Sequence, residues 1–519
     1  MNLKLQIKDY LAYLIIFSIP IFLGTYYSFF IHDFHHWTYS LSNFYDYKNG
    51  LKLFQDIFLQ YGAGQIIFFN LISIFFEINM LSIGIITNVI FASNLIFFYL
   101  ILRKYFSYLI TILTILLILL IHPFAHYPWP DYYSGFCITL FFYLFLLNKQ
   151  NNFLTVLQAS LLFLAIFFRT SYLIHIMTSI LFFILLDYIY FKQKKFNKLF
   201  LFFLIQLFFY LLFLSINGQL LSWFEQGIGA IKIYTYGSNN PYMSSIISYL
   251  GEYGWLFLKL IKVTIRWITQ IFNIFKISNF IFAIFLVLSF IFFIQILIKK
   301  KYRILEYQKY SLILLISLFG LIQGFMIYEN FRIINSSIGL FFLGLFFLKI
   351  KQLKTNFILM IILPLIYIYF TVKLLIGFPN NSTFIKFEIK DENSFVNSKY
   401  EFFSKKKKLS KLVDKYYEDV YKTICNKNLK ITNISPDFSI PYICSVEYKK
   451  DLSPYWYPKI EKINPKEYFR ITNSDLYENE VLITKDPIFD SKIILITKLS
   501  SPHEPSVWYG KYLYIYKKK

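Results

Sequence analysis

The sequence predicts an all-α polytopic membrane protein of about eleven transmembrane helices, followed by a small α+β domain outside the membrane. Three observations lead to this fold class. Hydrophobic residues make up 57% of the chain, a composition suited to lipid surroundings. Apolar stretches of roughly 20 residues, the length that crosses a bilayer core, recur between Ile15 and Ile376. Beyond them the chain becomes polar, so we divide it into a multi-span domain, 1–376, and a soluble domain, 377–519.

The expected spans are 11–29, 81–102, 107–122, 132–147, 153–168, 171–190, 199–216, 278–298, 310–328, 333–348 and 355–376. The first follows Lys4 and Lys8, has no small-residue cleavage site and precedes further spans. It is therefore expected to be an anchor rather than a removed signal peptide, with the N-terminus in the cytoplasm.

Basic residues decide the orientation. With a cytoplasmic start, the basic clusters at 103–104, 149, 192–198, 299–303 and 349–354 all fall at cytoplasmic turns, as the positive-inside tendency requires. After an odd number of crossings the C-terminal domain lies outside, in a periplasm-like space. The expected location is thus the plasma (inner) membrane, with many passes.

One further apolar stretch, 64–80, is long enough to raise the question of another span. It contains Glu77 and Asn79, and a separate crossing there would turn every later basic cluster outward. We therefore expect a re-entrant or interfacial segment that leads into the second span.

The stretch 255–272 predicts a helix that lies in the membrane interface. It carries Lys259, Lys262 and Arg266 on one face and aliphatic side chains on the adjoining face. Two interpretations of these cations remain open. They could simply anchor the helix to the membrane, or they could contact a bound lipid phosphate directly.

The soluble domain combines two periodicities. Residues 405–427 have helical periodicity, whereas two stretches near the C-terminus alternate as strands do. The domain holds Cys425 and Cys444, and the third cysteine, Cys137, lies inside a span. An oxidising compartment would let the two domain cysteines pair, and the alternative is two buried thiols.

Several classes of protein are disfavoured. The net charge of +23 comes largely from the expected cytoplasmic turns, where anionic lipid headgroups are the ordinary partner, so we expect no nucleic-acid partner. No GxxxxGK[ST] string and no paired CxxC occurs, which gives no support to an ATP-driven pump or a structural zinc module.

Ionisable residues gather at the outer ends of the expected spans. Charges in or near lipid are costly and often mark a pathway or a site, and these would line one cavity if the spans form a bundle. Acids beside arginines suit a reaction on an anionic substrate, because a carboxylate can take a hydroxyl proton while arginines stabilise a departing phosphate. The residues are Asp33, His35, His36, Asp46, Asp56, Asp131, Arg169, His175, Glu329 and Arg332.

The first outer loop contains HDFHHW at 32–37, Gly50 and FQDIFLQYG at 54–62. This opening resembles the GT-C superfamily of integral-membrane glycosyltransferases, whose members include protein mannosyltransferase-like and aminoarabinose-transferase-like proteins. The resemblance covers roughly residues 10–175 by motif and the remainder by architecture, which is many spans followed by an extracytoplasmic tail.

The resemblance implies roles for single residues. The first outer loop of the superfamily carries an acid implicated in catalysis, which implies Asp33 as the base or as the group that orients the acceptor. Asp131, in YPWPDYYS, matches a second outer-loop acid. Arg169, in FFRTSYL, resembles a basic residue that follows a later span, and Arg332 is the expected contact to a lipid phosphate.

This sequence departs from the superfamily at His36 and Trp37, where related sequences often have an acid and a glycine. His35 or His36 is therefore expected to share the role of the base. The implied reaction is transfer of a hexose or pentose from a polyprenyl-phosphate-linked donor to a cell-envelope glycan, lipid or protein, with inversion at the sugar carbon.

Each residue also has a structural interpretation. Asp33 and Asp131 could cap helices, and Arg169 and Arg332 could extend to headgroups. Asp46 and Asp56 are expected to be solvated loop residues. The sequence indicates no definite cofactor and leaves a divalent metal open, since the imidazole and carboxylate groups of HDFHH suit Zn or Mn.

Two other functions compete with glycosyl transfer. A transporter or lipid-linked oligosaccharide flippase predicts ionisable groups near the bilayer midplane and inverted repeats, and no repeat is evident. An O-antigen-type polymerase or ligase is also a many-span enzyme with a large outer loop, and only the first-loop motif argues against it.

Overall fold

The computed structural model describes residues 7–30, 34–59, 61–121, 128–147, 151–191, 196–227, 277–298, 304–324, 330–350, 395–425, 429–435, 437–447, 470–471, 473–502 and 511–519, with single positions at 265, 269, 363, 364 and 367. The expected span 355–376 and the interfacial helix 255–272 lie almost entirely outside these residues, as do Lys259, Lys262 and Arg266.

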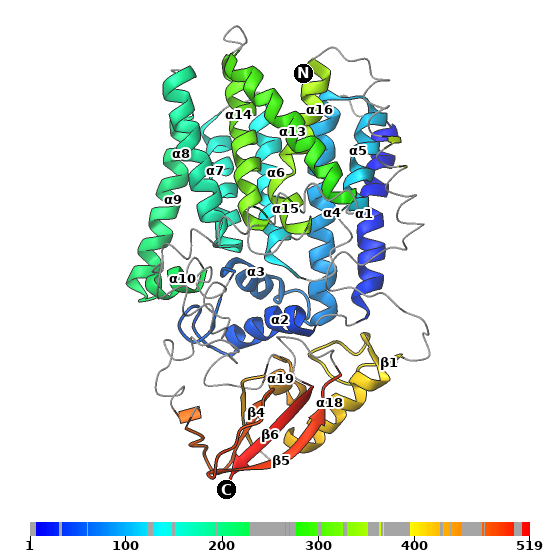
Figure 1. Ribbon diagram of the computed structural model, residues 1–519, viewed down its shortest axis with the longest axis vertical. Coiled ribbons are helices and arrows are strands. Elements are labelled where there is room, and N and C mark those ends of the chain that lie inside the picture. Colours follow the sequence, from blue (N-terminus) through cyan, green and yellow to red (C-terminus); the bar gives the residue numbers. More distant parts are fainter. Residues whose placement is uncertain are drawn as a thin grey trace.

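A bundle of roughly aligned helices forms the larger part of the molecule (Figure 1). In chain order it contains α1 (Ile7–Ser28), α4 (Met80–Tyr105), α5 (Tyr108–Ile121), α6 (Pro130–Leu146), α7 (Asn152–Phe168), α8 (Tyr172–Leu186) with the π-helical turn η1 (Asp187–Phe191), α9 (Asn197–Ile216), α13 (Ile277–Ile298), α14 (Ile304–Phe319) with the 3₁₀ turn η2 (Gly320–Gly324), α15 (Asn330–Ser337) and α16 (Gly339–Ile350). The soluble domain lies at one end of this bundle, and we call the helix ends that face it domain-proximal.

Four of the described helical segments are long and apolar enough to cross a membrane, judged by length and composition: Ile7–Tyr26, Met80–Tyr105, Tyr172–Tyr190 and Asn197–Ile216. Several other apolar helices are shorter, such as α6 with 17 residues and α16 with 12. The expected span 333–348 is divided between α15 and α16 at Ile338. A membrane protein of several helices is therefore supported, whereas the number eleven stays a prediction.

Small residues bring α1 and α4 together. A Cβ atom on Gly84 would lie 2.5 Å from Ser28 Oγ and 2.5 Å from the ring of Trp37, so no larger side chain fits there. Gly24 packs against the side chain of Asn88, whose amide donates to the Gly84 carbonyl at 2.8 Å. In lipid, where no hydrophobic force drives helices together, such close backbone approach holds helix pairs.

The end of the bundle away from the soluble domain carries matched charges. Arg103 donates to the Asp9 carboxylate at 2.7 Å, and the Tyr99 hydroxyl donates to the same oxygen at 2.7 Å. Lys104 and Lys309 donate to backbone carbonyls at the C-terminal end of α6, while Lys349 donates to one at the end of α4. Cations at helix C-termini satisfy carbonyls that have no partner within the helix.

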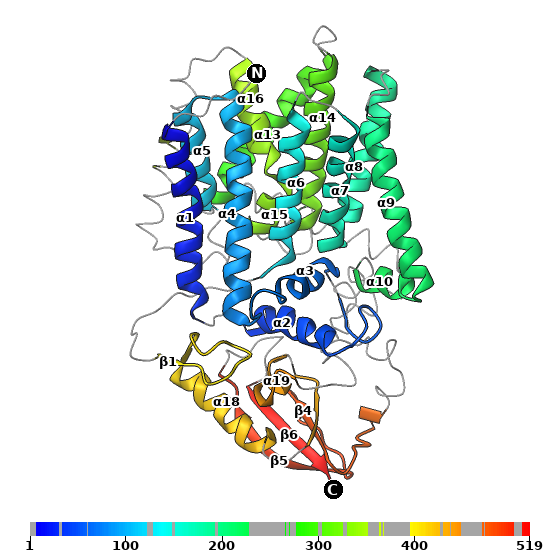
Figure 2. The same cartoon turned by 180° about the vertical axis from the view of Figure 1, so that it is seen from behind.

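Two short helices form a layer between the bundle and the soluble domain (Figure 2). They are α2 (Phe34–Lys48) and α3 (Gly64–Ile72), and α10 (Leu220–Gly227) lies beside them. The nine residues of α3 rise only about 14 Å, less than half the thickness of a bilayer core. Before α4 begins with Asn79 as its N-cap, segment 64–80 therefore holds no helix long enough to cross a bilayer, and its interfacial or re-entrant position stays a prediction.

The soluble domain is α+β, as expected. Strands β1 (Phe395–Asn397) and β2 (Lys408–Ser410) pair antiparallel, and a second sheet has the order β3 (Lys430–Asn433), β4 (Glu480–Thr484), β6 (Tyr512–Lys518), β5 (Ile493–Ser500). Only the β3–β4 pairing is parallel within that four-stranded sheet. Helices α18 (Lys411–Ile424) and α19 (Ile440–Cys444) pack on each other, and a disulfide joins Cys425 to Cys444.

The expected helix 405–427 begins later than its periodicity suggested. Its first residues form a turn and strand β2, and the helix starts where the Ser410 hydroxyl accepts from the Val413 amide at 3.3 Å. Pairing with β1 competes with helix formation for the backbone of 408–410, and the serine cap then sets the boundary.

The soluble domain docks directly on the bundle and on α2. The Met80 amide donates to the Phe402 carbonyl at 3.1 Å, and the Tyr442 hydroxyl donates to the Asp46 carboxylate. The ring of Tyr442 also stacks on Phe402, with centroids 5.4 Å apart. Asp46 is buried in this contact, so its expected place in a solvated loop was wrong.

We expect Gly84→Leu to destabilise the α1–α4 pair, because overpacking of a close contact costs about 1–3 kcal/mol. The measurement is the thermal unfolding midpoint of the purified protein in detergent. Val89→Leu, at a partly buried position of the same helix, is the control. Equal midpoints for the two variants would contradict the close approach at Gly84.

Candidate functional site

The candidate site lies where the domain-proximal ends of α6, α7, α8 and α15 meet, beside α3. Asp131 follows Pro130 in the first turn of α6, Arg169 directly follows α7, and Arg332 lies in the first turn of α15. The three side chains are buried, with Asp131 fully covered and the arginines 6% and 7% exposed. Sequence positions up to 201 apart along the chain thus supply charge to one end of the bundle.

Asp131 and Arg169 form a buried ion pair. The Arg169 Nε also donates to Ser171 Oγ at 3.0 Å, and that hydroxyl donates to Gln323 Oε1 at 2.7 Å. The guanidinium is thereby held from α6 on one side and from the start of α8 and η2 on the other. A buried charge needs such matching, because an ion without partners in an apolar interior is very costly.

Two aromatic rings join Arg169 to Arg332. The guanidinium of Arg169 lies over Tyr61 at 5.3 Å, and that of Arg332 lies over Trp129 at 4.9 Å. The rings of Tyr61 and Trp129 are themselves in contact, with centroids 4.7 Å apart. The order is therefore cation, ring, ring, cation.

Glycine places Tyr61 beneath Arg169. Gly62 has φ +134°, a conformation that side chains disfavour, and a Cβ atom there would lie 2.7 Å from the Phe167 carbonyl. The loop backbone can therefore lie against the end of α7, where the Thr170 amide donates to the Tyr61 carbonyl at 2.6 Å. The YG pair that ends FQDIFLQYG is thus explained by the close approach of two backbones.

Gln65 connects the layer to the segment before α6. Its side-chain amide donates to the Pro128 carbonyl, and its oxygen accepts from the Ser40 hydroxyl of α2 at 3.4 Å. Trp129 is the N-cap residue of α6 and follows directly. One side chain of α3 therefore ties α2 to the segment that carries Trp129 and Asp131.

Part of the expected site lies outside the described residues. This holds for Asp33 and Glu329, whereas the backbone of His35 and His36 lies in the first turn of α2 and their side chains are not described. Asp131, Arg169 and Arg332 are brought together by the ion pair and the two rings. Neither arginine extends toward headgroups, since both are buried against aromatic rings.

The remaining expected residues have other surroundings. The Asp56 carboxylate accepts from the Lys52 amide at 2.8 Å in a tight turn. His175 is buried in α8, where its Nε2 bonds the Ile316 carbonyl. Asp131 is not the N-cap of α6. Trp129 is the N-cap and Pro130 the first helical residue, so Asp131 is the second residue of the helix. Its place in the first helical turn suits the helix dipole, so a contribution to the helix end accompanies the ion pair.

Sequence reasoning missed Trp129, Gln65, Ser171 and Gln323. Trp129 had a signal, because it lies between two prolines in YPWPDYYS, next to the expected acid. The others had none, since a polar residue in an apolar sequence does not reveal its partner on another helix.

Among the described residues, no group of three His, Cys, Asp or Glu side chains is arranged to hold a metal ion. The side chains of HDFHH, where a metal was considered, lie outside this part of the chain. The chemistry of the described site is therefore that of its cations, rings and single carboxylate.

These side chains suit an anionic ligand. Among the described residues, two guanidinium groups and one carboxylate meet here, and each guanidinium lies over an aromatic ring. A stacked guanidinium still presents N–H groups in its plane, the geometry that matches the oxygens of phosphate or carboxylate.

Asp131 and Arg169 are expected to behave as a unit in folding. Asp131→Asn or Arg169→Gln alone should lower stability by about 3–5 kcal/mol, because each leaves a charge buried with less compensation. The double variant should lose less than the sum of the two. Thermal unfolding of all four proteins in detergent measures this, and additive losses would contradict the coupling.

Comparison with protein-family models, with curated proteins and with solved structures gave no match to this chain.

Proposed function

We propose that this protein is an integral-membrane glycosyltransferase that takes a sugar from a polyprenyl-phosphate donor and transfers it to a cell-envelope acceptor. The observation that carries the proposal is the buried pair of ring-stacked arginines with Asp131 at one end of an apolar helical bundle. The GT-C-like first loop supports it, since its Tyr61 and Gly62 form part of this arrangement.

The donor phosphate would bind the two guanidinium groups. In a site largely closed to water, arginines stabilise the negative charge that grows on the departing phosphate far more than they would in solvent. Asp131 acts here as a positioning residue, because its carboxylate holds Arg169. The polyprenyl chain stays in lipid, next to the apolar helices, and the sugar faces the α2–α3 layer.

The acceptor hydroxyl would attack the anomeric carbon from the face opposite the phosphate. The new bond forms between acceptor oxygen and sugar carbon, and the bond between that carbon and the phosphate oxygen breaks. Its electron pair leaves with polyprenyl phosphate, and the hydroxyl proton passes to a carboxylate, proposed to be Asp33, with His35 or His36 assisting. One displacement inverts the configuration.

The proposed topology has eleven spans, a cytoplasmic N-terminus and an extracytoplasmic C-terminal domain. The cations at the end of the bundle away from that domain, Arg103, Lys104 and Lys349, support it through the positive-inside tendency. The disulfide Cys425–Cys444 supports it as well, because disulfides persist in oxidising compartments.

Asp33→Asn is expected to reduce sugar transfer by about 10²-fold or more, because a general base contributes roughly that factor. The assay follows radiolabelled sugar from polyprenyl-phosphate donors into envelope material, in membranes with matched amounts of protein. Asp56→Asn, a carboxylate in an outer turn, is the matched control. Equal transfer by wild type and Asp33→Asn would remove Asp33 as the base, and no transfer with any donor would favour the flippase.

Arg332→Lys is expected to impair transfer nearly as much as Arg332→Gln, because a lysine keeps the charge but loses the planar group that stacks on Trp129. Initial rates at varied donor concentration should show a higher KM, a lower kcat or both. Lys198→Gln removes an exposed charge elsewhere on the bundle and should leave both constants unchanged. Full activity of Arg332→Lys would show that a point charge is sufficient.

A further inference from the structure

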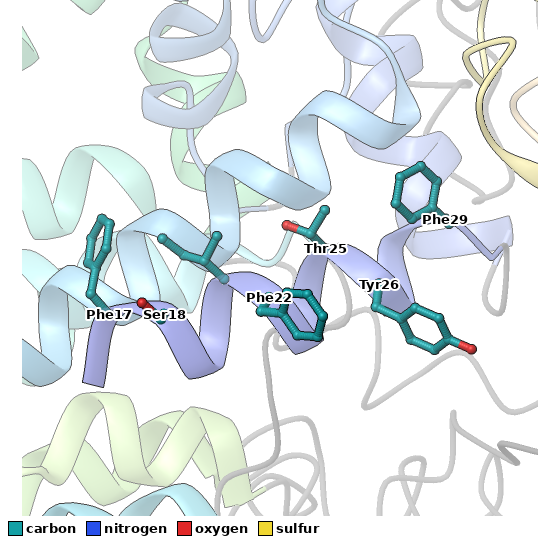
Figure 3. A pocket seen from close by; sticks show the side chains of 7 residues that line it. Phe17, Ser18, Phe22, Thr25, Tyr26 and Phe29 are labelled. Atoms are coloured by element: carbon teal, nitrogen blue, oxygen red, sulfur yellow. The ribbon is translucent and has the colours of Figure 1, made fainter. Parts of the chain in front are cut away.

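An open apolar groove of about 480 Å³ runs along α1 (Figure 3), and none of its described lining residues belongs to the candidate site. Its lining within the described part of the chain comes from one face of α1 and from Phe29 just beyond the helix, and it includes Phe17, Phe22 and Tyr26. Phe22 is 73% exposed, and Tyr26 is 40% exposed. Because α1 is one of the candidate membrane spans, a face of this kind meets lipid chains rather than water.

A run of four lysines, Lys405–Lys408, lies at the domain-proximal end of this groove. The Lys408 amide donates to the carbonyl of the groove residue Phe29 at 2.6 Å. The Lys408 ammonium lies 5.8 Å from the ring centre of Phe30, which packs on Tyr26 at 5.6 Å. In Figure 3 the yellow ribbon of the soluble domain lies beyond Phe29.

A tight turn presents the lysines. Ser404 has φ +86°, and its carbonyl accepts from the Lys407 amide at 3.0 Å. Lys405 and Lys406 are exposed and Lys408 is half-buried, while Lys407 points inward over Trp37. Burial holds the pKa of Lys407 well below its ordinary value, so the other three carry the accessible charge.

These three lysines are not neutralised by ion pairs within the described part of the chain. The same turn contains one acid, Glu401, which leaves an excess of positive charge beside the groove. An apolar groove at membrane depth that ends in a basic cluster is complementary to a molecule with long hydrocarbon chains and an anionic head.

We propose that this surface binds an anionic phospholipid, with acyl chains along α1 and the headgroup phosphate on Lys405, Lys406 and Lys408. The lysine cluster attracts anionic headgroups, and the effect falls off within a Debye length of the surface. The bound lipid would cover the seam between α1 and the soluble domain. This inference does not rest on the proposed glycosyl transfer, because it uses none of the residues of the candidate site.

The test measures lipids that stay bound to the full-length protein after it is released from nanodiscs of equal parts phosphatidylglycerol and phosphatidylcholine, by native mass spectrometry. Wild type should retain phosphatidylglycerol over phosphatidylcholine. A Lys405→Gln, Lys406→Gln, Lys408→Gln triple variant should lower that preference at least about fivefold. The control triple, Lys517→Gln, Lys518→Gln, Lys519→Gln, removes as much charge at the far end of the domain and should keep it.

A second pair of variants tests the groove. Thr25→Trp fills it and should remove bound phosphatidylglycerol, whereas Leu14→Trp, on an exposed part of α1 outside the groove, should not. The proposal is overturned if the two lysine triples behave alike, or if Thr25→Trp retains as much lipid as wild type. Loss of both lipids in Thr25→Trp with an unchanged ratio in the 405–408 triple would also overturn it, since the headgroup would then not be selected.

Discussion

Burying charge among apolar helices is costly unless each charge meets a partner, and this constraint organises both ends of the bundle. At one end Arg103 meets Asp9, and lysines meet the carbonyls that finish α4 and α6. At the other end Arg169 meets Asp131. The two solutions differ in chemistry. Carbonyl partners satisfy lysines without adding charge, whereas the arginines near the soluble domain rest on aromatic faces that leave their N–H groups directed in plane.

The layer of α2 and α3 positions the aromatic rings at the end of the bundle near the soluble domain. Glycine at 62 lets the loop backbone reach the end of α7, which positions the ring of Tyr61, while Gln65 secures the segment that carries Trp129. The same layer receives the soluble domain, because α2 carries Asp46, the partner of Tyr442. The candidate site and the surface on which the soluble domain packs thus lie on two sides of one thin layer. A shift in α2 would therefore change the contacts at both.

Much of the architecture could be predicted from the sequence, because apolar length and basic clusters depend only on local composition. The helices, the lack of a helix of spanning length over 64–80 and the α+β domain follow from such patterns. The number of spans is a different matter, since the expected span 333–348 is interrupted at Ile338, between α15 and α16. The start of α18 was misplaced for a similar reason, because strand pairing competed with helical periodicity.

The site could be predicted only in its charged members. Asp131, Arg169 and Arg332 stand out because charge is rare in apolar sequence, yet nothing local shows that Asp131 pairs with Arg169 and that rings lie between the arginines. Asp46 was taken for a solvated residue because its partner, Tyr442, is 396 positions away. Such contacts belong to tertiary structure and leave no local pattern.

The end of α1 illustrates what such distant contacts mean for assembly. Its Ser28 carbonyl accepts from Lys407, 379 residues later, at 2.8 Å, and the Phe29 carbonyl accepts from the Lys408 amide. A helix end needs partners for its last carbonyls. The donors to these two carbonyls, Lys407 and Lys408, are added only when nearly four fifths of the chain has been synthesised. During synthesis, water or lipid headgroups must serve in their place. The first helix to form is therefore among the last to reach its final hydrogen bonding, and chains truncated before Lys407 would leave that end open.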